Sequence, residues 1–247
     1  MLETVVLTAS AGTFAGLAAA LSNAPVILEE HPLVSFESPS DWSQLDRALM
    51  NASEFGAVAV TSPRAARALT DRLQVLGISW KDSAPTVWAG GSGTAAELRD
   101  VAPRVKIPES QGDSSRGAAE TVARAMVNAG VAGPVLFACG EPRRHELPMI
   151  LRENGIDVRE VVCYRSVLAS RSEAGSALAR GSMVVVASPS VMALVSDVCH
   201  VSARPRLIAA GPTTAMSATA HGWPPDAVAS EPSTEGVASA IRSVLGS

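Results

Sequence analysis

The run Val-Ala-Val-Thr-Ser-Pro at residues 58–63 decides the fold, because the chain carries nearly the same run again at residues 184–189, as Val-Val-Val-Ala-Ser-Pro. A short β-branched apolar run is typical of a buried strand. Serine followed by proline is typical of a helix start, since serine caps free N–H groups and proline suits the first helical position. Each copy therefore predicts a strand, a tight turn and a helix.

A second pair of matching turns follows the first. Residues 90–94 read Gly-Gly-Ser-Gly-Thr after one apolar run, and residues 210–214 read Ala-Gly-Pro-Thr-Thr after another. The two pairs predict two similar α/β lobes. Open α/β sheets bind ligands at the carboxyl ends of their strands, where such turns lie. We expect the four turns to face a common space between the lobes.

Short apolar strands alternate with helical patterns along the chain, which predicts βα units and parallel sheets. The strands are expected at residues 4–8, 26–28, 57–60, 86–89, 105–107, 134–138, 158–162, 183–187, 206–209 and 227–229. Helices are expected at 63–76, 117–128, 146–154 and 234–245, and Gly155 is expected to end the third of these. The pattern predicts two parallel sheets of five strands each, flanked by helices.

Two stretches, residues 31–34 and 164–167, are interpreted as segments that connect the lobes. The chain would leave the first lobe at one segment and re-enter it at the other. The predicted division is a discontinuous α/β lobe of residues 1–30 and 168–247, with an inserted α/β lobe at 35–163.

Composition argues against several classes of protein. The formal net charge is -4 and 47% of residues are hydrophobic, which argues against a disordered chain and against a nucleic-acid binder. Cys139, Cys163 and Cys199 lack any CxxC spacing, so a disulfide framework or zinc site is not expected. No apolar run reaches the ~20 residues of a membrane span. We expect a cytoplasmic protein with no membrane partner.

The turns have two interpretations. Each one, taken singly, is explained by helix capping alone. Together they would present backbone N–H groups, the positive ends of helix dipoles and hydroxyls, which suit carboxylates or phosphates. The turn at 90–93 has neither GxGxxG nor P-loop spacing, and the four histidines lack metal-ligand spacing, so we expect no nucleotide, no metal and no cofactor.

Tyr164, the only tyrosine, lies at the expected junction between the lobes. A phenol stays protonated at neutral pH and can donate a proton or a hydrogen bond. The bare sequence leaves two interpretations open: an acid, or a side chain that packs at a hinge with its hydroxyl in water. Cys139, within Phe-Ala-Cys-Gly at 137–140, is interpreted as a small buried hydrophobe rather than a nucleophile.

The motifs in their order resemble the uroporphyrinogen-III synthase family. Matching stretches lie at residues 32–36, 60–65, 91–95, 136–140, 147–148, 151–152, 155–156, 162–165, 188–190, 211–215 and 231–233, together with Arg144. No one of them is decisive, but their order and spacing together are specific. The chain departs from the pattern at residues 8–10, where Thr-Ala-Ser stands in place of an arginine that many bacterial members carry.

The resemblance implies two HemD-like lobes joined by a two-segment linker, and a monomeric, cofactor-free hydro-lyase of haem biosynthesis. The implied substrate is hydroxymethylbilane, a linear tetrapyrrole with eight carboxylates. In the mechanism accepted for the family, loss of the hydroxyl gives an azafulvene cation. The last pyrrole ring then attacks through its substituted carbon, and a spiro intermediate fragments and recloses to uroporphyrinogen III.

On this mapping Tyr164 matches the family tyrosine proposed to assist departure of the hydroxyl. The resemblance and the turn chemistry together assign substrate binding to Thr61, Ser62, Arg64, Gly91, Ser92, Thr94, Cys139, Gly140, Ser188, Ser190, Gly211, Thr213 and Thr214. The alternative, from another class, is a non-catalytic bilobal module that binds a tetrapyrrole or another polyanion. Formation of the type III isomer discriminates between the two.

Overall fold

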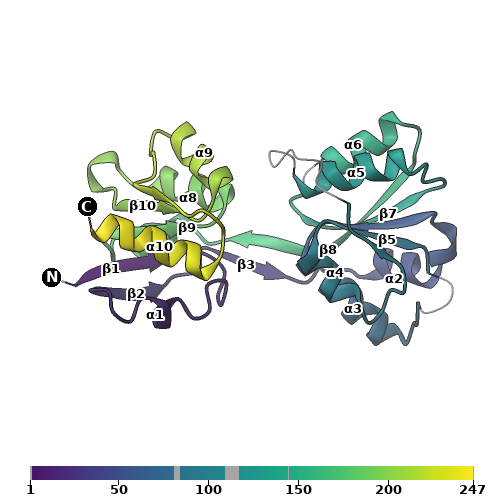
Figure 1. Cartoon of the computed structure of the whole chain (residues 1–247), viewed down its shortest axis with the longest axis horizontal. Helices are drawn as coiled ribbons and strands as arrows, with labels where there is room; N and C mark the ends of the chain where they lie inside the picture. Colours follow the sequence, from purple (N-terminus) through teal and green to yellow (C-terminus); the bar gives the residue numbers. More distant parts are fainter. Residues whose placement is uncertain (1, 81–83, 109–116, 144, 247) are drawn as a thin grey trace. The chain divides into compact units, whose positions relative to one another are not determined.

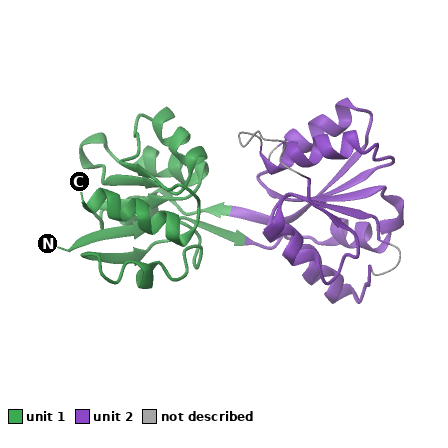
Figure 2. Ribbon diagram, in the orientation of Figure 1, with its two compact units in different colours: residues 1–36, 167–247 green, residues 37–166 purple. Residues whose placement is uncertain are grey.

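The computed structural model describes residues 2–80, 84–108, 117–143 and 145–246 (Figure 1). Arg144, one of the residues that carry the family resemblance, lies outside these ranges. The chain folds into two compact units, residues 1–36 with 167–247 and residues 37–166 (Figure 2). Among the described residues, no helix combines the length and the apolar character needed to cross a bilayer.

Unit 1 is a parallel sheet of five strands in the order β11-β10-β9-β1-β2. The strands are β1 (Glu3–Leu7), β2 (Val26–Glu30), β9 (Met183–Val186), β10 (Arg206–Ala209) and β11 (Ala227–Val228). The helices are α1 (Leu17–Ala20), α7 (Arg171–Leu178), α8 (Pro189–Val198), α9 (Pro212–Ala220) and α10 (Thr234–Leu245), with a 3-10 turn at Val201–Ala203.

Both faces of the unit 1 sheet are covered. Val184 and Val186 of β9 pack with residues of α7 and α8, whereas Met183 and Val185 pack with residues of α1 and α10. Successive side chains of a strand point to opposite faces, so a strand buried on both sides is apolar at every position. That is why the β-branched run at 183–186 shows no polar alternation.

The second sheet has six strands in the order β3-β8-β7-β4-β5-β6 and lies in unit 2 except for most of β3 and the end of β8. The strands are β3 (Val34–Glu37), β4 (Ala57–Val60), β5 (Thr86–Ala89), β6 (Val105–Lys106), β7 (Val135–Glu141) and β8 (Val158–Leu168). The helices are α2 (Ser43–Met50), α3 (Pro63–Leu76), α4 (Ser92–Leu98), α5 (Ala118–Asn128) and α6 (Glu146–Glu153), with a 3-10 turn at Ala52–Glu54. One apolar core lies between the sheet and α2, α3 and α4, and a second lies between the sheet and α5 and α6.

The two sheets share one strand order. Read across unit 2 the order is β8-β7-β4-β5-β6, and across unit 1 it is β2-β1-β9-β10-β11. In both, the central strand (β4 or β9) is the one that ends in Ser-Pro. The units differ in which of these strands comes first along the chain. In unit 2 it is the central strand β4. In unit 1 it is β1, followed by β2, and the central strand β9 comes only after unit 2.

The expectation of five strands in each sheet was wrong for the second sheet, because β3 adds a sixth. This strand is only four residues long and alternates between half-buried and exposed positions directly after Pro32 and Leu33, so its apolar signal is weak. The predicted connecting stretch 164–167 has the conformation of a strand, as part of β8. The boundaries of the units fall inside β3 and β8: the one between residues 166 and 167 lies within the predicted segment 164–167, and the one between residues 36 and 37 lies two residues after the predicted segment 31–34.

The strongest local signals gave accurate element bounds. Helices α3 and α10 and strands β4, β5 and β10 occupy the predicted residues. The stop after α6 is confirmed too: Gly155 has a φ of 75°, the left-handed conformation that glycine adopts without a Cβ penalty. Its N–H donates to the carbonyl of Arg152 at 3.0 Å.

Candidate functional site

The turn after β4 is an N-cap. Ser62 is extended, with φ -139° and ψ 145°, and its Oγ accepts a hydrogen bond from the N–H of Ala65 at 3.2 Å. Pro63 occupies the first helical position, where its missing N–H removes no helical hydrogen bond. The cap satisfies one of the free N–H groups of α3 and leaves the positive end of the helix dipole beside Thr61 and Ser62.

The turn after β9 has the same geometry. Ser188 has φ -146° and ψ 150°, and its Oγ accepts from the N–H of Val191 at 3.3 Å. Pro189 again stands at the first helical position. The predicted equivalence of the two Ser-Pro turns is therefore confirmed at the level of backbone angles and hydrogen bonds.

The glycine turns also match. The N-cap residue of α4 is Gly91 and that of α9 is Gly211, and both are extended, with φ of 169° and 176°. Just before them, the N–H of Gly90 donates to the carbonyl of Val60 and the N–H of Ala210 to that of Val186, each at 2.9 Å. These bonds hold the second turn of each unit against the first.

Close packing also restricts the turn after β5. A Cβ at Gly90 would lie 2.9 Å from both the Cα and the carbonyl oxygen of Thr61. A glycine is needed here because the two turns approach backbone to backbone. The sequence singled out Gly91 in this turn, whereas the tighter steric requirement is at Gly90.

The predicted site residues gather at the carboxyl edge of the sheet in each unit. Val60 pairs in register with Ala89 and Ala138, so the turns that follow β4 and β5 and the end of β7 lie at one edge of unit 2. Val186 pairs with Ala209, which places the turns of α8 and α9 at one edge of unit 1. The unit 2 set comprises Thr61, Ser62, Arg64, Gly91, Ser92, Thr94, Cys139, Gly140 and Tyr164; the unit 1 set comprises Ser188, Ser190, Gly211, Thr213 and Thr214.

The exposure of these residues divides them by what they can offer a ligand. Ser92, Ser190 and Thr213 are exposed in the first turns of their helices. The side chains of Thr94 and Thr214 are buried, with residue exposures of 3% and 4%. At these helix starts the backbone N–H groups and the exposed hydroxyls, rather than the two buried threonines, are available to an anion.

Tyr164 lies at the same edge of unit 2. It is half-buried on β8, and its hydroxyl oxygen is 3.4 Å from Oγ of Ser62. The guanidinium carbon of Arg64 lies 5.9 Å from the centroid of the tyrosine ring, within range of a cation–π interaction. Partial burial of the guanidinium lowers the pKa of Arg64, and the nearby Tyr164 acts in the opposite direction. A phenol, a serine hydroxyl and a cation therefore meet at one helix start.

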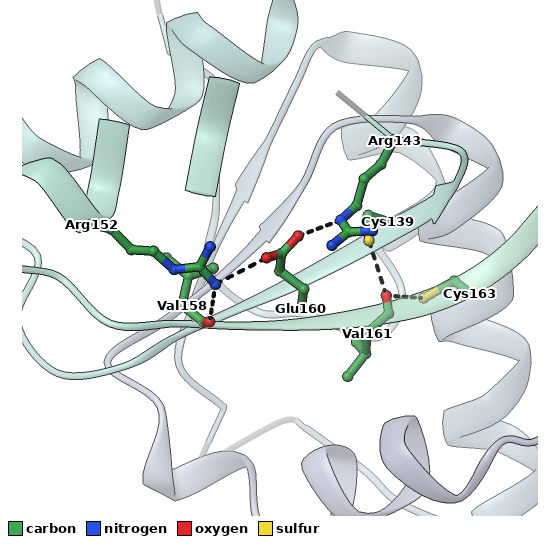
Figure 3. A network of polar contacts seen from close by, with 7 residues as sticks. All are labelled: Cys139, Arg143, Arg152, Val158, Glu160, Val161 and Cys163. Carbon is green, nitrogen blue, oxygen red and sulfur yellow. Dashed lines mark hydrogen bonds and ion pairs between the residues drawn. The ribbon is translucent and has the colours of Figure 1, made fainter. Parts of the chain in front are cut away.

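The two cysteines near this edge are buried thiols. Burial raises the pKa of Cys139 to about 12, and it also raises the pKa of Cys163. Both Sγ atoms donate to the carbonyl oxygen of Val161, at 3.4 and 3.8 Å (Figure 3). The interpretation of Cys139 as a buried hydrophobe is confirmed, since the residue is almost fully buried.

A polar network next to these thiols was not predicted from the sequence. The carboxylate of Glu160 on β8 accepts from Nε of Arg143 and, at 2.9 Å, from Arg152 (Figure 3). Burial acts to raise the pKa of Glu160, but hydrogen bonds from the two arginines outweigh it, so the pKa is lowered. The network ties the segment after β7, and helix α6, to the strand that carries Tyr164.

Across residues 2–80, 84–108, 117–143 and 145–246, no three His, Cys, Asp or Glu side chains gather as metal ligands would. Fold and site together define an α/β protein in which each sheet presents helix starts suited to an anionic small molecule. A family model described as uroporphyrinogen-III synthase HemD matches residues 15–239. The chain belongs to the uroporphyrinogen-III synthase family, a family of lyases of haem biosynthesis.

Solved structures of uroporphyrinogen III synthases share the fold. A mutant enzyme from the extremely thermophilic bacterium Thermus thermophilus aligns over 99% of both chains, with a TM-score of 0.70 and 14% identity. Uroporphyrinogen-III synthetase from Helicobacter pylori aligns over 99% of this chain and 100% of its own, with a TM-score of 0.62 and 20% identity. The wild-type Thermus enzyme in another crystal form has a TM-score of 0.53 and 16% identity, over 98% and 96% of the two chains.

Proposed function

We propose that the chain converts hydroxymethylbilane into uroporphyrinogen III, with Tyr164 as the proton donor and with the turns of both units as binding sites for the substrate carboxylates. The observation that carries the proposal is the position of Tyr164. Its phenol lies at the carboxyl edge of the unit 2 sheet, beside the capped start of α3 and under the guanidinium of Arg64. The residue that matches the proton donor proposed for the family therefore lies beside a helix start that suits an anion.

The chemistry asked of Tyr164 is one proton transfer. The phenol gives its proton to the hydroxyl of the substrate's hydroxymethyl group as the carbon–oxygen bond breaks, and the electron pair of that bond leaves with water. The adjacent pyrrole nitrogen supplies electrons to the carbon, which gives the azafulvene cation. The last ring then forms the new carbon–carbon bond and later loses a proton, which restores the proton balance of the cycle.

Backbone donors suit the binding role because the substrate carries many carboxylates. The starts of α3, α8 and α9 supply oriented N–H groups and the positive end of a helix dipole without any lysine. The overall charge of -4 does not prevent this, since charges on the surface are largely screened beyond ~8 Å at physiological salt. Local donors, rather than net charge, then decide affinity.

The proposal extends to the state of the protein. We propose a cytoplasmic monomer whose one partner is its small-molecule substrate, with no nucleic-acid or membrane partner. Support comes from the mild net charge and from Cys139, Cys163 and Cys199, which are all free thiols. Reduced thiols are typical of a cytosolic protein.

A product assay tests the function. The protein is incubated with freshly made hydroxymethylbilane without any added metal, nucleotide or flavin, and the oxidised products are separated into type I and type III isomers. We expect the type III isomer. Production of the type I isomer alone, as in the uncatalysed ring closure, would contradict the enzyme function and favour the non-catalytic binding module.

A further inference from the structure

The strand pair β7–β8 is irregular where Tyr164 lies. Cys139 pairs with Val162, but the next residue, Gly140, pairs with Tyr164. Cys163 is therefore an extra residue, as in a β-bulge, where two residues on one strand oppose one on its partner. Bulges change the direction in which the following side chains point.

The bulge explains which face Tyr164 occupies. Val158 packs into the core beside α5 and α6, whereas Val161 and Cys163 pack into the core beside α3. Strict alternation from Val158 would place residue 164 on the α5 side. Instead Tyr164 packs against the α3-side core, and its ring lies near Ser62 and Arg64 at the start of α3.

Gly140 makes room for the ring on that face. A Cβ built at position 140 would lie 2.2 Å from Cζ, 2.5 Å from Cε2 and 2.6 Å from the hydroxyl oxygen of Tyr164. Carbon atoms in contact are about 3.5–4.0 Å apart. The reactive end of the tyrosine therefore occupies the space that any other residue's Cβ would fill.

The contact with Ser62 is a weaker constraint. Its 3.4 Å oxygen–oxygen distance exceeds the 2.5–3.0 Å of ordinary hydroxyl hydrogen bonds, and Oγ of Ser62 already accepts from Ala65. Packing against residue 140 therefore decides where the phenol sits more than the serine does.

We propose that Gly140 and the bulge at Cys163 are the positioning device of Tyr164, with Gly140 acting on the reaction only through the tyrosine. This rests on the proposed catalytic role of Tyr164. It gives Gly140 a role other than contact with the substrate: its missing side chain sets the place of the phenol.

The first test is Gly140→Ala, assayed for kcat and KM in the full-length protein. The new methyl group meets the end of a side chain that can rotate, so the protein should fold while the ring moves by more than about 1 Å. A displacement of that size costs on the order of 10²-fold in rate. We expect a fall of about that size in kcat, with KM within about threefold, because substrate binding by the turns is retained.

A double-mutant cycle separates positioning from other roles. In the Tyr164→Phe background there is no phenol to misplace, so Gly140→Ala should lower kcat by no more than about threefold further. The matched control is Gly175→Ala in α7, where a Cβ meets no atom within 4 Å, and its kcat should equal that of the wild type. Activities are divided by the folded fraction from circular dichroism.

The outcomes test the positioning role and the catalytic role separately. Near-normal kcat in Gly140→Ala overturns it, and so does an equal loss of kcat in both backgrounds. Near-normal kcat in Tyr164→Phe is a different result, because it removes the catalytic role on which the proposal rests. If Gly140→Ala folds poorly, the melting temperature is compared in the Tyr164→Ala background, where the methyl group has room: a smaller loss there supports the packing, and an equal loss refutes it.

Discussion

Units 1 and 2 have the same strand order and the same two turns at the carboxyl edge, yet the only tyrosine of the chain lies beside the Ser-Pro turn of unit 2. The capped starts of α3 and α8 agree to within 7° in φ and 5° in ψ of the cap residue (-139° and 145° against -146° and 150°). The structure that is repeated in both units is therefore the capped helix start, whose N–H groups suit an anion.

The unrepeated part lies on β7 and β8, the first and second strands to one side of the central strand β4. Val60 of the central strand pairs with Ala138, two residues before Gly140. In unit 1 the counterpart of Val60 is Val186. Since Val185 pairs with Leu7, the same register places Val186 opposite Thr8, and the residue two positions further, Ser10, corresponds to Gly140. Unit 1 has no counterpart of Tyr164, since the chain holds one tyrosine. We infer that both units bind carboxylates of the substrate and that the proton transfer takes place at unit 2.

The largest effect expected is from Tyr164→Phe. The variant keeps the ring and its packing and removes the proton, and positioned acid catalysis is worth ~10²–10⁴-fold. We expect a loss of kcat at the lower end of this range, because water can partly replace the phenol. Steady-state assays of the type III product measure it. Turnover within about twofold of the wild type would contradict a catalytic role for the tyrosine and would remove the main difference between the units.

The shared binding role is tested by adding one negative charge at equivalent positions. Gly93→Asp in α4 and Thr213→Asp in α9 each place a carboxylate at the second residue of a helix, with Gly93→Asn and Thr213→Asn as neutral controls. A carboxylate there stabilises the helix by ~0.3–1 kcal/mol. It should also repel the substrate and raise KM about tenfold, equivalent to ~1.4 kcal/mol. A rise in KM for only one of the two variants would show that one unit dominates binding.

The third prediction concerns the Glu160 network, found in unit 2. Glu160→Gln should destabilise the protein by ~1–3 kcal/mol at pH 7, because it weakens hydrogen bonds from Arg143 and Arg152 to a partly buried carboxylate. The folded-state pKa of Glu160 is lowered, so its contribution is present above the ordinary value of about 4.3 and is lost as pH falls through the folded value.

Urea unfolding at a series of pH values measures the difference in unfolding free energy between the wild type and Glu160→Gln. The wild type and Glu160→Gln should converge as the pH falls below about 4. Glu153→Gln is the control, since Glu153 is exposed on the neighbouring α6 and should change stability by no more than ~0.5 kcal/mol. A constant difference between wild type and Glu160→Gln across this range would show that the charge of Glu160 is unimportant.

The smallest effect expected is from the two capping serines. Ser62→Ala and Ser188→Ala should each cost ~1 kcal/mol of stability, because each removes one N-cap hydrogen bond. Their kcat values should stay within about threefold of each other, since the 3.4 Å contact of Ser62 with Tyr164 is too long to be strong. A much larger loss of kcat for Ser62→Ala would assign positioning of the phenol to Ser62 rather than to Gly140.

Sequence reasoning succeeded where structure depends on neighbours along the chain. The runs at 57–63 and 183–189 contain a buried strand, a cap and a proline within seven residues each, so the bounds of β4 and β9 were predicted to within one residue. It failed at β3, whose four residues alternate between half-buried and exposed positions and carry little apolar signal. It also missed the Glu160 network, because Arg143, Arg152 and Glu160 show no common spacing and meet only through the pairing of β7 with β8.

By itself, the sequence determined the strand–turn–helix chemistry, its repetition and the family, since each is encoded in short runs and in their order. Tertiary structure alone decided the sixth strand, the bulge at Cys163 and the packing of Tyr164 on Gly140. The physical reason is range: capping and periodicity act over a few residues, whereas Ser62 and Tyr164 are 102 positions apart and meet only through strand register. One extra residue in β8 moves the phenol to the other face of the sheet, and no local pattern records that shift.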